Sequence, residues 1–457
     1  MHAYRPRTPA QINDDLLHFV VRTPRWFWFA AGGLGAVVGA GVVAEALMVL
    51  AGLQLLGLTN TVMWAVLITN FIFWVGISHA GVMVSAILRL TQAEWRRPIT
   101  RAAEVLAVFA LVTASLFPLI HTGRVWRTAY WVFPYDFARN VWPNVRSALI
   151  WDPSAIVTYL LGTTLFVYAG LIPDLAVARD RTTGWRHWLY GAAALGFRGT
   201  TRQWRLQHAA GMLFSALILA VFISVHSIVA WDLSMALVPG WHTTILAPYF
   251  VIGAVHSGVA GVVTTMVVLR RILRVADYIT LEHFDAIGRL QIVVALAYLF
   301  FFLSDFSFAL FERDALEVRI WELRLITPPT NVLFLLQVLA TLIIPVPFWL
   351  FRRFRRSVAA MFWTSIAVNI GMWLERYILV VTPLSFKQPF VFTWVTTYEP
   401  RPVEYVFTVA SVALVALGVL VFAKLLPIVP VWEQQESQVV HQEVAAGRAR
   451  LPAVIRE

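Results

Sequence analysis

Long apolar runs alternate with short polar segments rich in arginine along nearly the whole chain. Each run holds about 20 residues, the length that an α-helix needs to cross a hydrocarbon core of about 30 Å. The pattern therefore predicts an all-α polytopic membrane protein with about ten transmembrane helices. We place them at residues 27–53, 61–89, 102–122, 154–178, 206–231, 245–270, 286–311, 331–351, 357–382 and 404–429.

Two of the predicted helices share a short motif. The stretches 79-HAGVMVSAILRL-90 and 256-HSGVAGVVTTMVVLRRIL-273 both run from His-x-Gly into an apolar stretch that ends in arginine. The similarity predicts two four-helix bundles in parallel pseudo-repeat, and chance similarity between apolar helices is the alternative. The predicted organisation is a cytoplasmic N-terminal segment (1–26), a transmembrane domain (27–430) with bundles at about 61–231 and 245–382 and flanking helices at 27–53 and 404–429, and a cytoplasmic tail (431–457).

The composition supports a membrane protein and limits its cofactors. Hydrophobic residues make up 59% of the chain and charged residues 13%, with a mean hydropathy of +0.72, whereas globular proteins average about 25% charged residues. Because the chain has no cysteine, it cannot by itself bind an iron–sulfur cluster or a covalently attached c-type haem. We interpret the net charge of +11 as positive cytoplasmic loops and not as a surface for nucleic acid.

The positions of the basic residues predict the orientation of the helices. Segments that alternate from a cytoplasmic N-terminus place most Lys and Arg residues in cytoplasmic loops, among them Arg89, Arg97 and Arg101. Both termini are then expected to be cytoplasmic. The outer segments 123–153 and 383–405 are crowded with aromatic residues and proline, which indicates either an interfacial belt or a docking surface for an extracytoplasmic partner.

Ionisable residues gather where the predicted helices meet the outer face, namely His121, Arg124, Asp152, His226, Asp232, Glu375 and Arg376. An ionisable group within a span costs at least ~2.5–3.5 kcal/mol, so such positions are candidates for function. Imidazole and carboxylate groups at a shared cleft can accept the two protons that a hydroquinone releases when it is oxidised. The alternative for each residue is an interfacial ion that caps a helix or forms a salt bridge. Glu45 and Asp305, each alone on its helix, are weaker candidates.

Glu375 and Arg376 are adjacent in 370-IGMWLERYILVV-381. Neighbouring residues on a helix point about 100° apart, so we expect that these two side chains do not neutralise one another face to face. We predict that Arg376 faces the cleft and that Glu375 faces a neighbouring helix or a proton exit.

A second polar group is predicted nearer the cytoplasmic face. It contains His79 beside Ser78, Asp174 after Pro173, and His256. Pro173 removes a backbone donor and kinks its helix, which frees a carbonyl group for water or a side chain. The group predicts a proton relay into the membrane, with a polar packing contact between helices as the alternative. The histidines also allow a di-haem cytochrome b, but the unequal depths of His79 and His256 argue against that interpretation.

Five longer motifs resemble a known family of membrane subunits. They are 77-ISHAGVMVSAILRLTQAEWRRPITRAAE-104, 121-HTGRVWRTAYWVFPYD-136, 172-IPDLAVARDR-181, 224-SVHSIVAWD-232 and 370-IGMWLERYILVV-381. The sequence resembles the NrfD/polysulfide reductase membrane-subunit family and, within it, most resembles the larger, ten-helix quinol-binding membrane subunit of bacterial alternative complex III. The resemblance extends from the second predicted helix to the tenth.

This resemblance implies a quinol-oxidising subunit of a quinol:electron-acceptor oxidoreductase in the bacterial inner membrane, with menaquinol or ubiquinol as substrate. The implied partners are an extracytoplasmic iron–sulfur subunit, c-type cytochrome subunits and a second membrane subunit of the same family. Haem, iron–sulfur clusters and metal ions are not expected on this chain itself. The implied quinol site contains His121, Asp152, Asp232 and Arg376, to which we add Arg124 and His226, and the implied proton route contains His79 and Asp174, to which we add His256 and Glu375.

Two other functions share part of these observations. A membrane anchor and quinone-site subunit of a molybdopterin oxidoreductase, of the polysulfide or tetrathionate reductase type, has the same fold and a different electron partner. A secondary transporter built from parallel repeats would use Asp174 and His79 as coupling groups. The subunits that co-purify with the chain distinguish these functions.

Overall fold

Ten helices are long and apolar enough to cross a membrane in the part of the chain that the computed structural model describes, which confirms the predicted all-α architecture. The described residues are 7–127, 148–236, 238–386, 398–437, 440–446 and 449–455. The spanning helices are α2 (Arg25–Ala51), α3 (Val66–Leu90), α4 (Thr100–His121), α6 (Ala148–Asp180), α8 (Thr201–Ser234), α9 (Leu246–Ile272), α10 (Leu281–Glu312), α12 to α13 (Thr330–Leu350), α15 (Val358–Phe386) and α16 (Pro402–Leu425).

Shorter elements connect the spans or cover their ends. The helices are α1 (Pro9–Val21), η1 (Leu53–Leu55), η2 (Glu94–Arg96), η3 (Val125–Arg127), α7 (Trp185–Ala193), α11 (Ala315–Leu325), α14 (Arg352–Arg355) and α17 (Val431–Glu436), and a π-helical turn, η5 (Leu339–Ile343), separates α12 (Thr330–Val338) from α13 (Pro345–Leu350). Two antiparallel strands, β1 (Val440–Ala446) and β2 (Ala449–Ile455), follow α17. Residues 128–147 and 387–397, which fall within the two predicted docking segments, lie outside the described residues.

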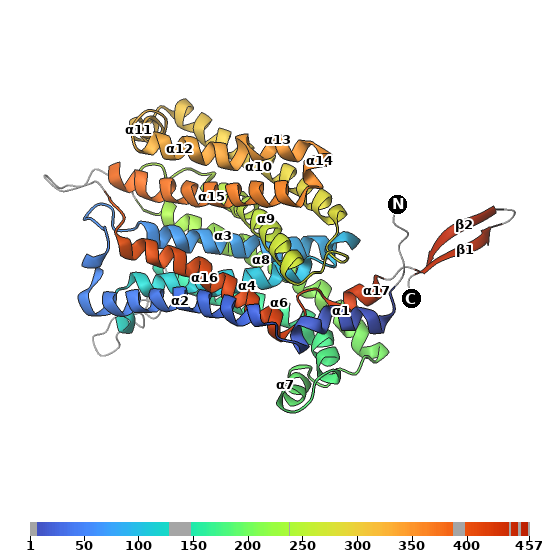
Figure 1. Ribbon diagram of the computed structural model, residues 1–457. Coiled ribbons are helices and arrows are strands. Elements are labelled where there is room, and N and C mark those ends of the chain that lie inside the picture. Colours follow the sequence, from blue (N-terminus) through green and yellow to red (C-terminus); the bar gives the residue numbers. More distant parts are fainter. Residues whose placement is uncertain are drawn as a thin grey trace.

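The spanning helices surround α3, which is almost completely buried. Helix α3 packs on α4, α8 and α9, and α6 packs on α8. On the other side, α9 packs on α10 and α15, and α12 packs on α15. Helices α2 and α16 lie side by side, and α16 contacts α4 (Figure 1). The end that carries α1 and α17 is here called the inner end and the opposite end the outer end, following the predicted orientation.

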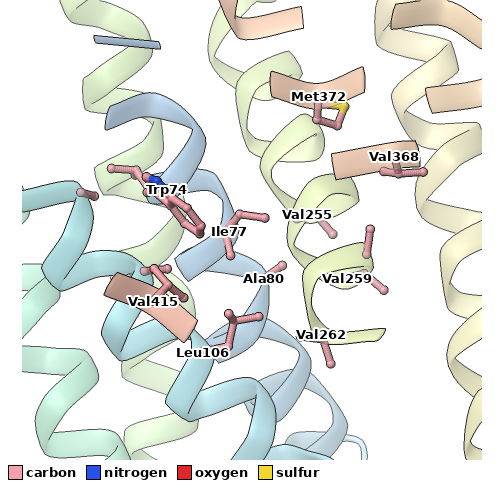
Figure 2. Packing of buried hydrophobic residues seen from close by; sticks show 14 of the residues in the cluster. Trp74, Ile77, Ala80, Leu106, Val255, Val259, Val262, Val368, Met372 and Val415 are labelled. Carbon is pink, nitrogen blue, oxygen red and sulfur yellow. The ribbon is translucent and has the colours of Figure 1, made fainter. Parts of the chain in front are cut away.

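Small residues let the central helices approach closely. Ile77 and Ala80 of α3 face Val255 and Val259 of α9 in the middle of the core (Figure 2). A Cβ atom added at Gly258 would lie 2.2 Å from the Cβ of Ala80. Packing by small residues is a main source of helix association in membranes, where burial from water provides little force. The glycine of the second His-x-Gly motif is therefore a packing position.

Gly258→Ala is expected to destabilise the protein by about 1–3 kcal/mol, the usual cost of overpacking. The added methyl group meets the Ala80 methyl group and, at 3.0 Å, the Ile77 carbonyl oxygen, which are fixed to a helix and cannot rotate away. The midpoint of thermal unfolding, followed by tryptophan fluorescence in detergent, measures the effect. Gly33→Ala is the matched control, because no atom lies within 4 Å of the added Cβ there. Equal midpoints for the two variants would contradict this packing role.

Candidate functional site

Two carboxyl groups meet at the outer end of the first four-helix group, which contains α3, α4, α6 and α8. Asp152 lies in the first turns of α6 and Asp232 in the last turn of α8, and the two side chains are within hydrogen-bonding reach of one another. Both oxygens of Asp232 and Oδ1 of Asp152 are buried and have no other hydrogen-bond partner among the described residues. Two adjacent carboxylates in such surroundings repel one another when both are charged, so the pair is suited to accept a proton.

His121 ends α4 at the same end of the molecule. Its ring meets Trp64 edge to face, with 6.4 Å between the ring centroids. Its Nδ1 atom is buried and lacks a hydrogen-bond partner in the described part of the chain. Arg124 follows α4 and is exposed. The structure thus brings Asp152 and Asp232 together and places His121 at the same end, without a described contact between the imidazole and the carboxyl pair.

His226 lies deeper than the carboxyl pair. It precedes Asp232 by six residues on α8, about 9 Å along the helix. Its ring meets His79 of α3 edge to face, with 4.6 Å between centroids, and His79 stacks on Tyr159 of α6 at 4.4 Å. His79 Nδ1 contacts the carbonyl oxygen of Val75. His226, predicted in the outer group, and His79, predicted in the inner group, are therefore direct neighbours in the centre of the membrane region.

Glu375 and Arg376 contact one another, which corrects the expectation that they do not. Nη1 of Arg376 lies 3.1 Å from Oε2 of Glu375. The angle of about 100° separates the Cβ atoms, but both side chains are long enough to bend towards the same point. In a site shielded from water, the attraction outweighs the loss of side-chain freedom. The adjacent charges are an ion pair and not two independent groups.

The guanidinium group of Arg376 is held against α9. It lies over the ring of Phe250, 4.4 Å from the centroid. A Cβ atom at Gly253 would lie only 2.7 Å from Arg376 Nη2, so this glycine makes room for the arginine. Phe250 also contacts His226, with 5.8 Å between ring centroids. Arg376 is thus one aromatic ring away from the central histidine pair.

His256 of α9 points into the second four-helix group, which contains α9, α10, α12 to α13 and α15. Its Nε2 atom lies 3.2 Å from the carbonyl oxygen of Thr341, and its ring stacks on Tyr298 at 5.4 Å. Tyr298 in turn accepts a hydrogen bond from Tyr249 at 3.3 Å. No described contact joins His256 to His79 or to Asp174, so the three members of the predicted inner group occupy separate surroundings.

Asp174 lies in a buried ionic cluster at the inner end. Its Oδ1 atom accepts hydrogen bonds from the backbone N–H groups of Val431 and Trp432, both at 3.1 Å. Its Oδ2 atom lies 3.1 Å from Nη1 of Arg101, whose Nε atom lies 3.4 Å from Glu104. The side chain of Arg101 is only 2% exposed, so the interpretation of this arginine as a loop charge is wrong. It is an interior cation that pairs with two carboxylates, those of Asp174 and Glu104.

Helix α17 covers this cluster. Glu433 is 1% exposed and pairs with Arg89 at 3.1 Å and Arg96 at 2.8 Å, while Arg97 donates to the Glu433 carbonyl oxygen at 2.9 Å. Burial alone would raise the pKa of Glu433, but the attraction of Arg89 and Arg96 holds this pKa below its usual range. Val431–Glu436, the first residues of the predicted cytoplasmic tail, are therefore packed into the inner end of the bundle.

Sequence reasoning missed the partners in these contacts. Ser85 donates to Glu104 at 2.5 Å, and Tyr159 stacks on His79, yet neither residue type stands out in a hydrophobic helix. The i, i+3 spacing of Arg101 and Glu104 was the one available signal, since this spacing places two side chains on one helix face. Among the described residues, no three His, Cys, Asp or Glu side chains are grouped as metal ligands.

The arrangement provides proton-binding groups at three depths. A carboxyl pair lies at the outer end, a histidine pair at the centre, and Asp174 with its cluster at the inner end. The described hydrogen bonds do not link these groups into one continuous chain. Side chains that accept and release protons near a membrane face suit the oxidation or reduction of a lipid-soluble quinone.

Comparison with known proteins identifies the family of the chain. The family model described as "Polysulphide reductase, NrfD" matches residues 54–386. The chain is also similar to a putative membrane subunit of dimethyl sulfoxide reductase from Halobacterium salinarum, with 25% identity over 233 residues, 50% of this chain and 48% of that protein. The chain therefore spans about half the length of this curated relative. Because the family model covers well over half of the chain, this protein belongs to the NrfD polysulphide reductase family of membrane subunits.

Proposed function

We propose that this chain is the quinone-reactive membrane subunit of a multisubunit oxidoreductase and that it oxidises menaquinol or ubiquinol at the outer ends of α4, α6 and α8. The observation that carries the proposal is the carboxyl pair of Asp152 and Asp232, which has buried oxygens without other described partners. Oxidation of one quinol to a quinone releases two protons and two electrons. The carboxyl pair and His121 accept the protons from the two hydroxyl groups.

The electrons leave the chain for a partner subunit. The sequence has no cysteine, the ligand that holds iron–sulfur clusters and c-type haem. We propose that an extracytoplasmic iron–sulfur subunit docks over the outer end and takes both electrons in single steps. The protons thus go to the carboxyl pair and the electrons to the partner subunit. This separation keeps the quinone from being reduced back to quinol.

A molybdopterin oxidoreductase is the complex that the relatives support best, since the similar archaeal protein carries the name of a dimethyl sulfoxide reductase subunit. Alternative complex III is the second candidate. Its support is the resemblance of long motifs such as RLTQAEWRRP and MWLERY across nearly all of the chain. In that case the electrons continue to c-type haems, and the central histidine pair and Asp174 belong to a proton route.

Arg376 has a different place in this proposal from the one that the sequence indicated. It lies at the depth of His226 and Phe250, below the carboxyl pair. We propose that the quinol head group binds nearer the outer face than Arg376 does. The positive charge of Arg376 then stabilises the carboxylate of Glu375 when Glu375 has lost its proton. Arg376 is then a positioning residue of the proton route and does not contact the quinol.

Affinity purification of the tagged chain from its native membrane tests the proposal. We expect an iron–sulfur subunit to co-purify and the complex to oxidise a water-soluble menaquinol analogue. A molybdopterin subunit in the preparation identifies the reductase type, whereas c-type haem absorption identifies alternative complex III. A chain that purifies without redox subunits and moves a solute across vesicle membranes would instead be a transporter, and the proposal would be wrong.

A further inference from the structure

A cavity of about 460 Å³ lies at the outer end of the second four-helix group, away from the carboxyl pair. Its wall contains Phe308 and Leu316, which are exposed, so the cavity opens to the surface. Three carboxylates, those of Glu312, Asp314 and Glu317, line it together with His242. An acidic wall of this kind raises the local concentration of protons and cations. We call this cavity the outer vestibule.

Glu317 is the most enclosed of these carboxylates. Burial raises its pKa above the usual range, although the N–H group of Gly240 donates to its Oε1 atom at 2.7 Å. Glu317 therefore gains and loses a proton nearer to neutral pH than an exposed glutamate does. An acidic group with this property at the mouth of a cavity is suited to exchange protons with water.

A second, smaller cavity lies deeper on the same side. Its volume is about 20 Å³, and Tyr249, Arg324, Gln337 and Glu375 are among the residues that line it. Arg324 Nε is buried there without a hydrogen-bond partner among the described residues, and the buried Oε2 atom of Glu375 has its ion-pair contact with Nη1 of Arg376 at 3.1 Å. A space of at least ~10–15 Å³ with two to four polar partners can hold one water molecule. The small cavity therefore has the size and the donors for one bridging water next to Glu375.

Asp305 lies between the two cavities. Its Oδ2 atom is 3.8 Å from Nη1 of Arg324, which lines the small cavity. The side chain of Thr243, which lines the outer vestibule, lies close to the Asp305 carboxylate. The Thr243 hydroxyl group has no well-aligned partner in the described part of the chain. Polar atoms thus follow one another from the outer vestibule to Glu375.

Charged and titratable groups face Glu375 from three other helices. Arg376 is its own neighbour on α15, Tyr249 approaches from α9, Asp305 belongs to α10 and Arg324 belongs to α11. The two arginines balance the two carboxylates, so the site is neutral when both acids are charged. A proton added to Glu375 therefore leaves the site with one net positive charge, and Asp305 is the carboxylate that lies nearby on the side of the outer vestibule.

We infer that the second four-helix group has its own proton route to the outer face, which runs from Glu375 through Arg324 and Asp305 into the outer vestibule, with water-borne protons as the ligand. The inference deepens the proposed function, because it gives the protons on Glu375 an exit that is separate from the quinol site. Asp305 is the proton-carrying group of this route, Arg324 is a positioning residue, and Glu317 and His242 line the exit.

Protonation kinetics of Glu375 in the purified complex, reconstituted in nanodiscs, test the route. The carboxyl band of Glu375 in infrared difference spectra is assigned by its loss in Glu375→Gln. After a pH jump, Asp305→Asn is expected to slow the response of this band about 100-fold, the scale of one lost acid–base group. Glu322→Gln is the matched control, since Glu322 lies on α11 but has a side chain that is 45% exposed and pairs with Arg319. An unchanged response in Asp305→Asn would overturn the inference.

Two further variants keep the test decisive if Asp305→Asn does not fold. Thr243→Val removes only a hydroxyl group at the vestibule wall and is expected to slow the same band. Because the chain has no cysteine, Thr243→Cys can be labelled selectively with a membrane-impermeant maleimide added from outside. Ser365→Cys, at a fully buried position on α15, is expected not to react. A Thr243→Cys side chain that is equally unreactive would overturn the inference.

The infrared measurement does not require turnover, so the two proposals can fail separately. If the unaltered complex oxidises no quinol while Asp305→Asn still slows the Glu375 band, the proposed function is wrong and the route stands. If quinol oxidation is normal and the band is unaffected by Asp305→Asn, the route is wrong and the quinol site stands.

Discussion

Replacing Asp232 by asparagine is expected to slow quinol oxidation by about 10²–10⁴-fold, the usual contribution of one general base. Asparagine has nearly the same size and keeps a hydrogen-bonding side chain, so the ends of α6 and α8 should still pack. It cannot accept a proton, however, so Asp152 is left without its proton-accepting neighbour. The steady-state rate with a menaquinol analogue, measured on the purified complex, gives the effect.

The contact between Asp152 and Asp232 also predicts how the effects of single and double substitutions on the rate combine. Because Asp152 and Asp232 act as one proton-accepting unit, Asp152→Asn together with Asp232→Asn should be little slower than either single variant. Asp180→Asn is the matched control on α6, since Asp180 lies at the opposite end of that helix, is 63% exposed and pairs with Arg179. Full activity in either single variant would remove the pair from the quinol site, and multiplied effects would show that the two residues act independently.

The spanning helices could be predicted from the sequence because hydrocarbon solvent imposes one local rule on every span. A stretch such as Arg25–Ala51 must satisfy all of its backbone groups by itself and must be apolar over about 20 residues. Neither condition depends on the rest of the fold. The prediction of ten helices is confirmed for this reason, and only their ends differ by several residues.

Contacts between distant segments could not be predicted in the same way. Residues 431–436 follow the last span and contain two glutamates, a composition that is typical of a solvated tail. Their burial depends on Arg89, Arg96 and Arg97, more than 300 positions earlier in the chain, and on Asp174 as an acceptor for the first backbone N–H groups. The interpretation of Arg101 as a loop charge is wrong for the same reason, since its carboxylate partner Asp174 comes from another helix.

Depth could be predicted for residues at the ends of the spans, but depth inside a span and direction around the helix axis could not, since His226 and His79 were expected at opposite depths and are neighbours. The sequence places the carboxyl pair at the ends of two spans, and the structure has both residues there. The sequence does not show that His226 turns towards His79, because helix packing, and not the local sequence pattern, decides which residue faces it. The sequence analysis did not predict the ion pair of Glu375 and Arg376, because the angle between neighbouring helix positions takes no account of side-chain length.

Glu433→Gln is expected to destabilise the protein by about 3–5 kcal/mol at neutral pH, the cost of leaving charges buried without their partner. Glutamine keeps the shape of the side chain but leaves Arg89 and Arg96 facing a neutral group. Helix α17 should then detach from the inner end, and the backbone N–H groups that bind Asp174 should leave with it. Thermal unfolding and protease cleavage after residue 430 measure the two effects.

The dependence of this loss on pH separates the ion pairs from simple packing. The pKa of Glu433 in the folded protein lies below its ordinary value of 4.5, because Arg89 and Arg96 outweigh the effect of burial. A lowered pKa contributes stability that is fully present above about pH 4.5 and is lost as the pH falls through the folded value. The stability difference between the natural protein and Glu433→Gln should therefore be constant near neutral pH and shrink in acid.

Glu436→Gln is the control on the same helix. Glu436 also pairs with an arginine, Arg97 at 2.8 Å, but its side chain is 35% exposed, so water screens the interaction and its loss should cost only about 0–1 kcal/mol. A large effect of Glu436→Gln, or a Glu433→Gln difference that persists undiminished in acid, would mean that α17 is held by its apolar contacts. In that case the buried charges at the inner end would be consequences of packing and not its cause.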